Sequence, residues 1–121
     1  MPLDWKSGAL AEGLRCYRAS EFFLAHEHWE SVWLKLEEPE KSFLQALIQT
    51  TAAFHHQRAG NSIGAASLLR RALRRLDLCP ASFGSINLEP FREEVRVWLR
   101  ALEDGRDAVP ARVPSIRVVG E

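Results

Sequence analysis

The chain has few cysteines, no excess charge of either sign and no long run of apolar residues. Cys16 and Cys79 are the only cysteines among 121 residues, and their wide separation predicts neither a disulfide framework nor a zinc knuckle. Sixteen basic residues balance sixteen acidic ones, so no overall field attracts nucleic acid or an anionic membrane. No apolar run approaches about 18 residues, and the first residues lack the pattern of a secretory leader. We therefore expect a cytoplasmic protein that does not enter a membrane.

Apolar residues recur with helical periodicity along most of the chain. The pattern predicts five helices, over about residues 8–19, 21–36, 39–59, 62–79 and 88–104. Ser20, Asn61 and Asn87 are placed to cap the second, fourth and fifth of them. Gly60 is suited to a left-handed turn that ends the third helix, so the fourth helix is expected to fold back antiparallel on the third.

The expected fold class is all-α, an irregular array of about five helices around a central antiparallel hairpin formed by the second and third helices. The length fits one domain. We expect a single helical domain over residues 1–105 and an extended C-terminal tail over residues 106–121, where Pro110 and Pro114 interrupt an apolar segment and lay it on the surface. Among the four tryptophans, Trp5 is the one expected outside the core.

Polar side chains interrupt the apolar faces of the second and third helices. Projection at about 100° per residue places His26 and Glu30 one turn apart on the side of the second helix that faces the core. On the third helix, the same projection places three polar residues in one narrow strip. Because helices joined by a short break usually pack antiparallel, the two strips are expected to meet. Five polar side chains would then converge in one buried cluster: His26, Glu30, Gln45, Gln49 and His56.

Two motifs in this region resemble a known family. Residues 21–33 read EFFLAHEHWESVW, and residues 43–49 read FLQALIQ, followed by His56 and by Gly60-Asn61. They are similar to the bacterial and archaeal family called domain of unknown function 309, over roughly residues 8–103. The resemblance implies a compact helical domain with no established activity. By motif position it implies seven candidate ligand-binding residues: His26, Glu27, Trp29, Glu30, Gln45, Gln49 and His56. His55 is set aside because it projects among Leu44 and Ile48.

Three interpretations of the polar cluster stay open. In the first, it is a site for a small ligand or a divalent metal, with His26, Glu30 and His56 as a ligand set of two histidines and one carboxylate. In the second, it is a hydrogen-bond network that only fixes helix register, within a helical module for protein interaction or scaffolding. In the third, His26 beside Glu30 is the acid/base pair of an enzyme. No nucleophile or phosphate-binding loop accompanies that pair, so enzymatic activity is left open.

Other sequence features argue against more specific functions. His26-Glu27 begins like the zinc-protease motif, but Glu30 stands where the second histidine is required. No Glu-Xxx-Xxx-His pair of the di-iron type occurs. A basic face on the fourth helix lacks interleaved aromatic residues, which is typical of a solvated face and argues against nucleic acid: Arg70, Arg71, Arg74 and Arg75. A small ligand, a protein partner and a homo-oligomer all stay open.

Overall fold

The computed structural model describes residues 3–105 and 109–121. It contains five helices, which confirms the predicted all-α class: α1 (Gly8–Arg18), α2 (Phe22–Trp33), α3 (Glu40–Arg58), α4 (Ser62–Leu76) and α5 (Leu88–Glu103). A short antiparallel pair of strands, β1 (Ser82–Phe83) and β2 (Ile86–Asn87), occupies the segment expected to be a loop before α5. No helix in this described part of the chain is long and apolar enough to cross a membrane. Met1, Pro2 and residues 106–108, which begin the predicted tail, lie outside the described residues.

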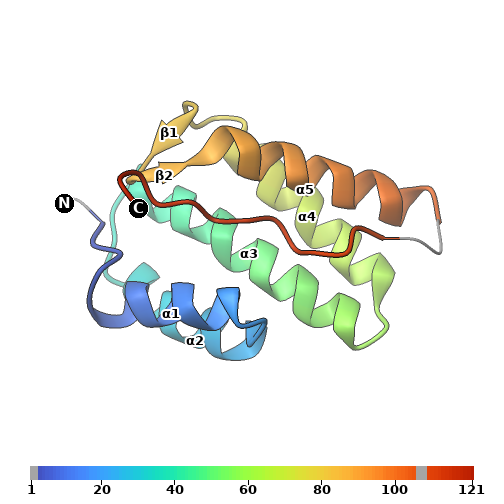
Figure 1. Ribbon diagram of the computed structural model, residues 1–121, viewed down its shortest axis with the longest axis horizontal. Coiled ribbons are helices and arrows are strands. Elements are labelled where there is room, and N and C mark those ends of the chain that lie inside the picture. The colour runs from blue at the N-terminus through green and yellow to red at the C-terminus, as the bar shows by residue number, and fades with distance from the viewer. Residues whose placement is uncertain (1–2, 106–108) are drawn as a thin grey trace.

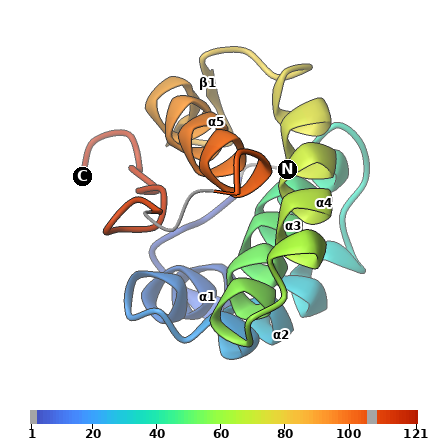
Figure 2. The same ribbon diagram turned by 90° about the vertical axis from the view of Figure 1, so that its right-hand side faces the viewer.

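Helix α3 is the centre of the array (Figures 1 and 2). It packs most extensively against α4 and also against α2, while α1 covers α2 and α5 covers α4. The central hairpin is therefore formed by α3 and α4, and the prediction of α2 and α3 as the central pair is wrong. The tight connection explains the close pairing of α3 with α4. Gly60 adopts a φ of +85°, and the Asn61 side chain caps α4 by accepting a hydrogen bond from the Gly64 amide at 2.9 Å, as predicted.

The C-terminal segment 109–121 crosses the side of the array between α1 and α5 (Figures 1 and 2). It contains no helix, as predicted, and forms one isolated β-bridge with β2. Its Pro114 and Ile116 are buried, so the segment covers the core there, while its other residues are exposed or half-buried at the surface. Three side chains of α1 and α5 donate hydrogen bonds to its carbonyl oxygens: Tyr17 to Pro114 (2.6 Å), Arg18 to Ile116 (2.7 Å) and Trp98 to Arg112 (2.8 Å).

The indole of Trp29 holds α1 against α2. This side chain is fully buried, and its Nε1 donates a hydrogen bond to the Leu10 carbonyl at 3.2 Å. Its ring stacks on Tyr17 with a centroid separation of 6.1 Å. The indole reaches the α1 backbone because residue 13 is glycine: a Cβ added to Gly13 would lie 2.2 Å from the Trp29 Nε1.

Two local predictions are wrong. Trp5 is buried, because its Nε1 donates a hydrogen bond to the Gly84 carbonyl at 2.7 Å and its ring meets Trp29 edge-on. Ser20 does not cap α2, because it adopts a left-handed φ of 60° within the turn, and Glu21 occupies the capping position. The first error arises from packing against a distant residue, and the second from the turn at the end of α1, where the Ser20 and Glu21 amides donate hydrogen bonds to the Tyr17 and Cys16 carbonyls.

Gly13→Ala is expected to destabilise the protein. Alanine in place of glycine inside a helix ordinarily stabilises by roughly 1 kcal/mol. Here the added methyl group would overlap the buried indole of Trp29, and forcing such a group into a packed core costs about 1–3 kcal/mol. Urea denaturation measures the change in the free energy of unfolding. A control pair made in a Trp29→Leu background should lose most of the penalty, and an equal penalty in that background would contradict the assigned clash.

Tyr17→Phe tests how the tail is attached. Burial raises the pKa of Tyr17 well above its usual value, and the nearby charge of Glu94 raises it further. Above about pH 10 the phenol of the unfolded chain ionises while the folded phenol keeps its proton, so this group's contribution to stability falls as the pH rises. The variant should lose about 1 kcal/mol at about pH 8, and this difference from wild type should shrink at about pH 10.5. Urea denaturation at both pH values measures it, and a pH-independent difference would contradict the prediction.

Candidate functional site

The polar strips of α2 and α3 lie along one interhelical groove but do not form a single cluster. One end of the groove holds a cavity of about 210 Å³, which we call the histidine cavity, lined by Phe22, Phe23, His26, Glu27, Ala52, His55 and His56. The other end holds a separate cavity lined by Trp33, Glu38, Lys41, Ser42, Gln45 and Arg75. The structure therefore brings His26, Glu27 and His56 to one cavity and places Gln45 in another.

His26 lies at the rim of the histidine cavity between two carboxylates. Its Nε2 is 3.5 Å from a Glu30 oxygen, and its Nδ1 is 3.8 Å from a Glu27 oxygen. The imidazole is 30% exposed, while the side chains of Glu27 and Glu30 are 59% and 51% exposed. The predicted burial of this pair is wrong, because α2 turns Ala25 and Trp29 into the core and leaves the neighbouring face at the groove.

The opposite wall of the cavity carries His55 and His56. The His56 Nδ1 is 3.3 Å from the Asn61 side-chain nitrogen, beside the cap of α4. His55 also lines the cavity, although its helical position predicted otherwise, and its ring lies 5.9 Å from the ring of Phe23. Phe23 is 58% exposed, although it is a large aromatic residue. The sequence did not predict that Phe23 lines a cavity, because it directly follows the buried Phe22.

Two of the predicted site residues have other surroundings. Trp29 is completely buried between α1 and α2, so it does not face the groove as a ligand-binding residue would. Gln49 is half-buried, and its Oε1 is enclosed without a hydrogen-bond donor among the described residues. The indole nitrogen of Trp33 is likewise enclosed without an acceptor. The described contacts therefore do not form a complete hydrogen-bond network along the groove.

The predicted metal ligands are not gathered at one point. Among residues 3–105 and 109–121, no group of three or more His, Cys, Asp or Glu side chains is arranged to hold a metal ion. His26 and Glu30 are neighbours on α2, whereas His56 stands across the cavity on α3. A cleft that presents imidazoles, a carboxylate and aromatic rings is suited to hydrogen bonding and stacking with an organic molecule.

Fold and cavity together define a small all-helical domain with an open cleft between α2 and α3 that histidine and phenylalanine side chains line. Residues 10–68, which hold all seven predicted site residues, match the family described as domain of unknown function (DUF309). Over this segment the chain is similar to that family, as its motifs predicted, although the match ends well before residue 103. The chain is also similar to an uncharacterised protein of Aquifex aeolicus (strain VF5), with 33% identity over 98 residues. That alignment covers 79% of this chain and 29% of the relative, so the chain spans less than a third of that protein.

Gln49→Met separates a structural role of the groove from a binding role. If the Gln49 amide were part of a network that holds α2 on α3, its loss would cost about 1–3 kcal/mol. Because its buried oxygen has no described donor, we expect the apolar isostere to be neutral or to stabilise by up to about 1 kcal/mol. Gln45→Met, one turn earlier on α3, is the matched control, expected within about 0.5 kcal/mol of wild type. Urea denaturation measures both, and a loss confined to Gln49→Met would favour the network.

Proposed function

We propose that this domain binds a small organic ligand with an apolar body and a basic head group in the histidine cavity. One observation carries the proposal. Three of the four histidines of the chain, from two helices, line one cavity together with two phenylalanines and a carboxylate. Nothing in the packing of α2 on α3 requires three imidazoles at the same place.

The aromatic lining favours a ligand with an apolar body. Phe23 leaves more than half of its side chain in solvent at the mouth of the cavity, and Phe22 and Ala52 line the cavity beside it. Covering apolar surface stabilises a complex by about 25 cal/mol per Å² before the costs of association are subtracted. An aromatic or aliphatic group of the ligand would recover this free energy by lying on the Phe23 ring.

The polar lining favours a basic head group. Glu27 lines the cavity and Glu30 contacts His26 from the next turn, so two carboxylates lie at this end of the groove. None of the described residues that line the cavity is a lysine or an arginine. A neutral imidazole offers one donor and one acceptor, so His26 and His56 can orient an amine whose charge the carboxylates balance.

The same lining favours binding over metal-dependent or covalent chemistry. A catalytic zinc site requires three protein ligands, and the structure does not gather His26, Glu30 and His56 into such a set. No serine, threonine or cysteine is among the described residues that line the cavity. Cys79 is not one of them, and burial raises the pKa of its thiol, which disfavours the reactive thiolate.

The basic face of α4 does not alter this proposal. Arg70 forms an ion pair with Glu103 at 2.8 Å, and Arg75 donates a hydrogen bond to the Ser42 hydroxyl at 3.4 Å. Arg74 remains exposed among solvated residues. We therefore propose a cytoplasmic domain that binds a small ligand and does not use this face to bind nucleic acid.

Benzylamine is the probe that tests the proposal. In titrations followed by NMR of the backbone amides, it should shift the resonances of residues around His26 and His56, with a Kd of about 1 mM, as expected for so small a ligand. Benzyl alcohol should bind more weakly and benzoate more weakly still, because the carboxylates repel an anion. His26→Ala should weaken benzylamine binding about fivefold or more. His28→Ala removes the histidine of α2 that does not line the cavity, and should leave binding unchanged.

The competing interpretations give different results. Equal binding of benzoate and benzylamine would contradict a basic head group. The absence of shifts at the cavity with all three probes would contradict ligand binding and favour the scaffold interpretation. Titration with Zn²⁺ tests the metal hypothesis separately: stoichiometric binding that His26→Ala and His56→Ala both abolish would replace the organic ligand with a metal.

A further inference from the structure

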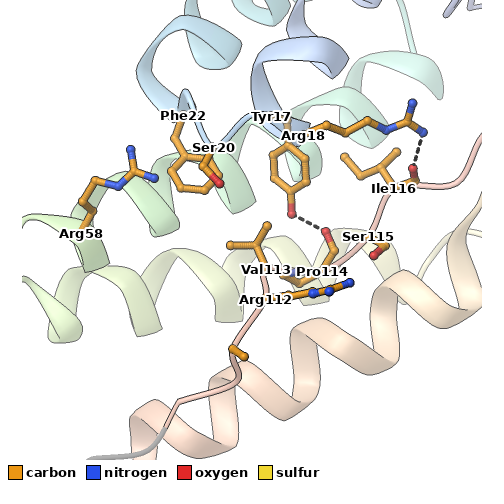
Figure 3. Close-up of a pocket in the computed structure, with 11 residues that line it drawn as sticks. Tyr17, Arg18, Ser20, Phe22, Arg58, Arg112, Val113, Pro114, Ser115 and Ile116 are labelled. Atoms are coloured by element: carbon orange, nitrogen blue, oxygen red, sulfur yellow. Dashed lines mark hydrogen bonds between the residues drawn. The ribbon is translucent and has the colours of Figure 1, made fainter.

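A second and larger cavity lies on the other side of the Phe22 side chain, between the α1–α2 turn and the C-terminal segment (Figure 3). It has a volume of about 370 Å³. The charged residues that line it are all arginines, Arg18 from α1, Arg58 from α3 and Arg112 from the C-terminal segment. No aspartate or glutamate is among the described lining residues. We call this the arginine cavity.

Two of these three arginines have no carboxylate partner among the residues that the structure describes. Arg18 donates hydrogen bonds to the side chain of Glu121 and to the carbonyl oxygen of Ile116, so its charge is balanced. Arg58 instead lies over the ring of Phe22 at 4.7 Å from the centroid. Neither Arg58 nor Arg112 forms an ion pair within the described part of the chain. The cavity therefore carries two positive charges that nothing described neutralises.

The arginines stand on different walls of the cavity. Figure 3 shows Arg58 reaching toward Phe22 on one side, while Arg112 lies on the C-terminal segment beside Pro114 and Ser115. Between these walls lie the aromatic ring of Phe22 and the apolar side chain of Val113. A ligand that enters the cavity would meet positive charge on either side of an apolar surface.

We propose that the arginine cavity binds a small organic phosphate, a phosphate monoester with an apolar or aromatic body. A phosphate monoester carries a charge of about −1.5 to −2 at neutral pH, so the positive charges on both walls of the cavity attract it. Guanidinium groups bind phosphate through paired, charge-assisted hydrogen bonds. The hydroxyls of Ser20 and Ser115, which also line the cavity, add donors for the phosphate oxygens, and Phe22 and Val113 provide the surface for the body.

This inference does not depend on the function proposed for the histidine cavity. The two cavities share Phe22 as a wall, but their charged residues differ in sign. Carboxylates border one and arginines line the other, so a probe that fits one cavity is repelled by the other. Failure of either proposal therefore leaves the other standing.

Phenyl phosphate is the probe that tests the arginine cavity. Isothermal titration calorimetry in a buffer without phosphate should detect binding, and NMR of the backbone amides should place it at Ser20, Arg58 and residues 112–116. Inorganic phosphate should bind more weakly because it lacks the apolar body, and phenol should bind weakly because it lacks the charge. Added salt should weaken the binding of phenyl phosphate.

Substitution of the unbalanced arginines should remove this binding. Arg58→Gln and Arg112→Gln are each expected to raise the Kd of phenyl phosphate about tenfold. Trp98 bonds to the backbone carbonyl of Arg112, so exchange of the side chain leaves that contact in place. Arg74→Gln is the matched control, because it makes the same change in charge at an exposed site on α4 and should bind like wild type. His26→Ala should also bind phenyl phosphate like wild type.

Each other outcome would overturn the proposal. If no binding is detected at about 10 mM phenyl phosphate, the affinity is weaker than the proposed charge contacts require, and the proposal is rejected. An equal loss in Arg74→Gln would mean that only net charge matters, and shifts at His26 would place the ligand in the other cavity. If Arg58→Gln fails to fold because its contact with Phe22 is lost, Arg58→Lys keeps the positive charge, and Arg112→Gln carries the test alone. Unchanged binding in Arg112→Gln would then reject the proposal.

Discussion

The contact between Trp29 and Gly13 is the constraint on which the rest of the structure depends. The indole fits against the α1 backbone only because residue 13 has no side chain, and its hydrogen bond to the Leu10 carbonyl fixes the position of the ring. This position brings Tyr17 into a stack with Trp29, and the Tyr17 hydroxyl then reaches the carbonyl oxygen of Pro114. The C-terminal segment that closes the arginine cavity is therefore held in place through a chain of contacts that begins at Gly13.

The same contact determines which face of α2 meets the groove. With Phe22, Ala25 and Trp29 turned into the core, the face that carries His26 lies at the boundary between α2 and α3. A polar stripe in this position is half-exposed, because the core behind it is already filled by the indole. The histidine cavity is a consequence of how α1 packs on α2, even though none of its lining residues belongs to α1.

Helical periodicity predicted much of this arrangement from the sequence. It predicted the five helices, the turn at Gly60 and Asn61, and the approach of His26 to His56, but not the separation of Gln45 from them. Periodicity indicates the direction in which a side chain points, but not how deeply it is buried. The strip that contains His26 therefore faces the expected neighbour while remaining near the surface.

Other features depend on contacts that no local pattern encodes. Trp5 donates a hydrogen bond to the Gly84 carbonyl, 79 residues away in the sequence, and Tyr17 donates one to the Pro114 carbonyl, 97 residues away. The arginine cavity is built from α1, α3 and the C-terminal segment, so its three arginines give no motif in the sequence. His55 was missed for a related reason, because the ring that it meets is presented by the start of α2.

The zero net charge of the chain argues against one kind of ligand only. A net charge of zero argues against binding to a long polyanion, which requires basic residues over an extended surface. It does not constrain recognition over a few ångströms, where the nearest charges dominate because salt screens those more than about 8 Å away. Around Phe22, carboxylates border one cavity, and two arginines without an ion pair among the described residues line the other, although the chain as a whole is neutral. If both cavities bind the ligands proposed for them, the choice of ligand depends on which side of the Phe22 ring a molecule approaches.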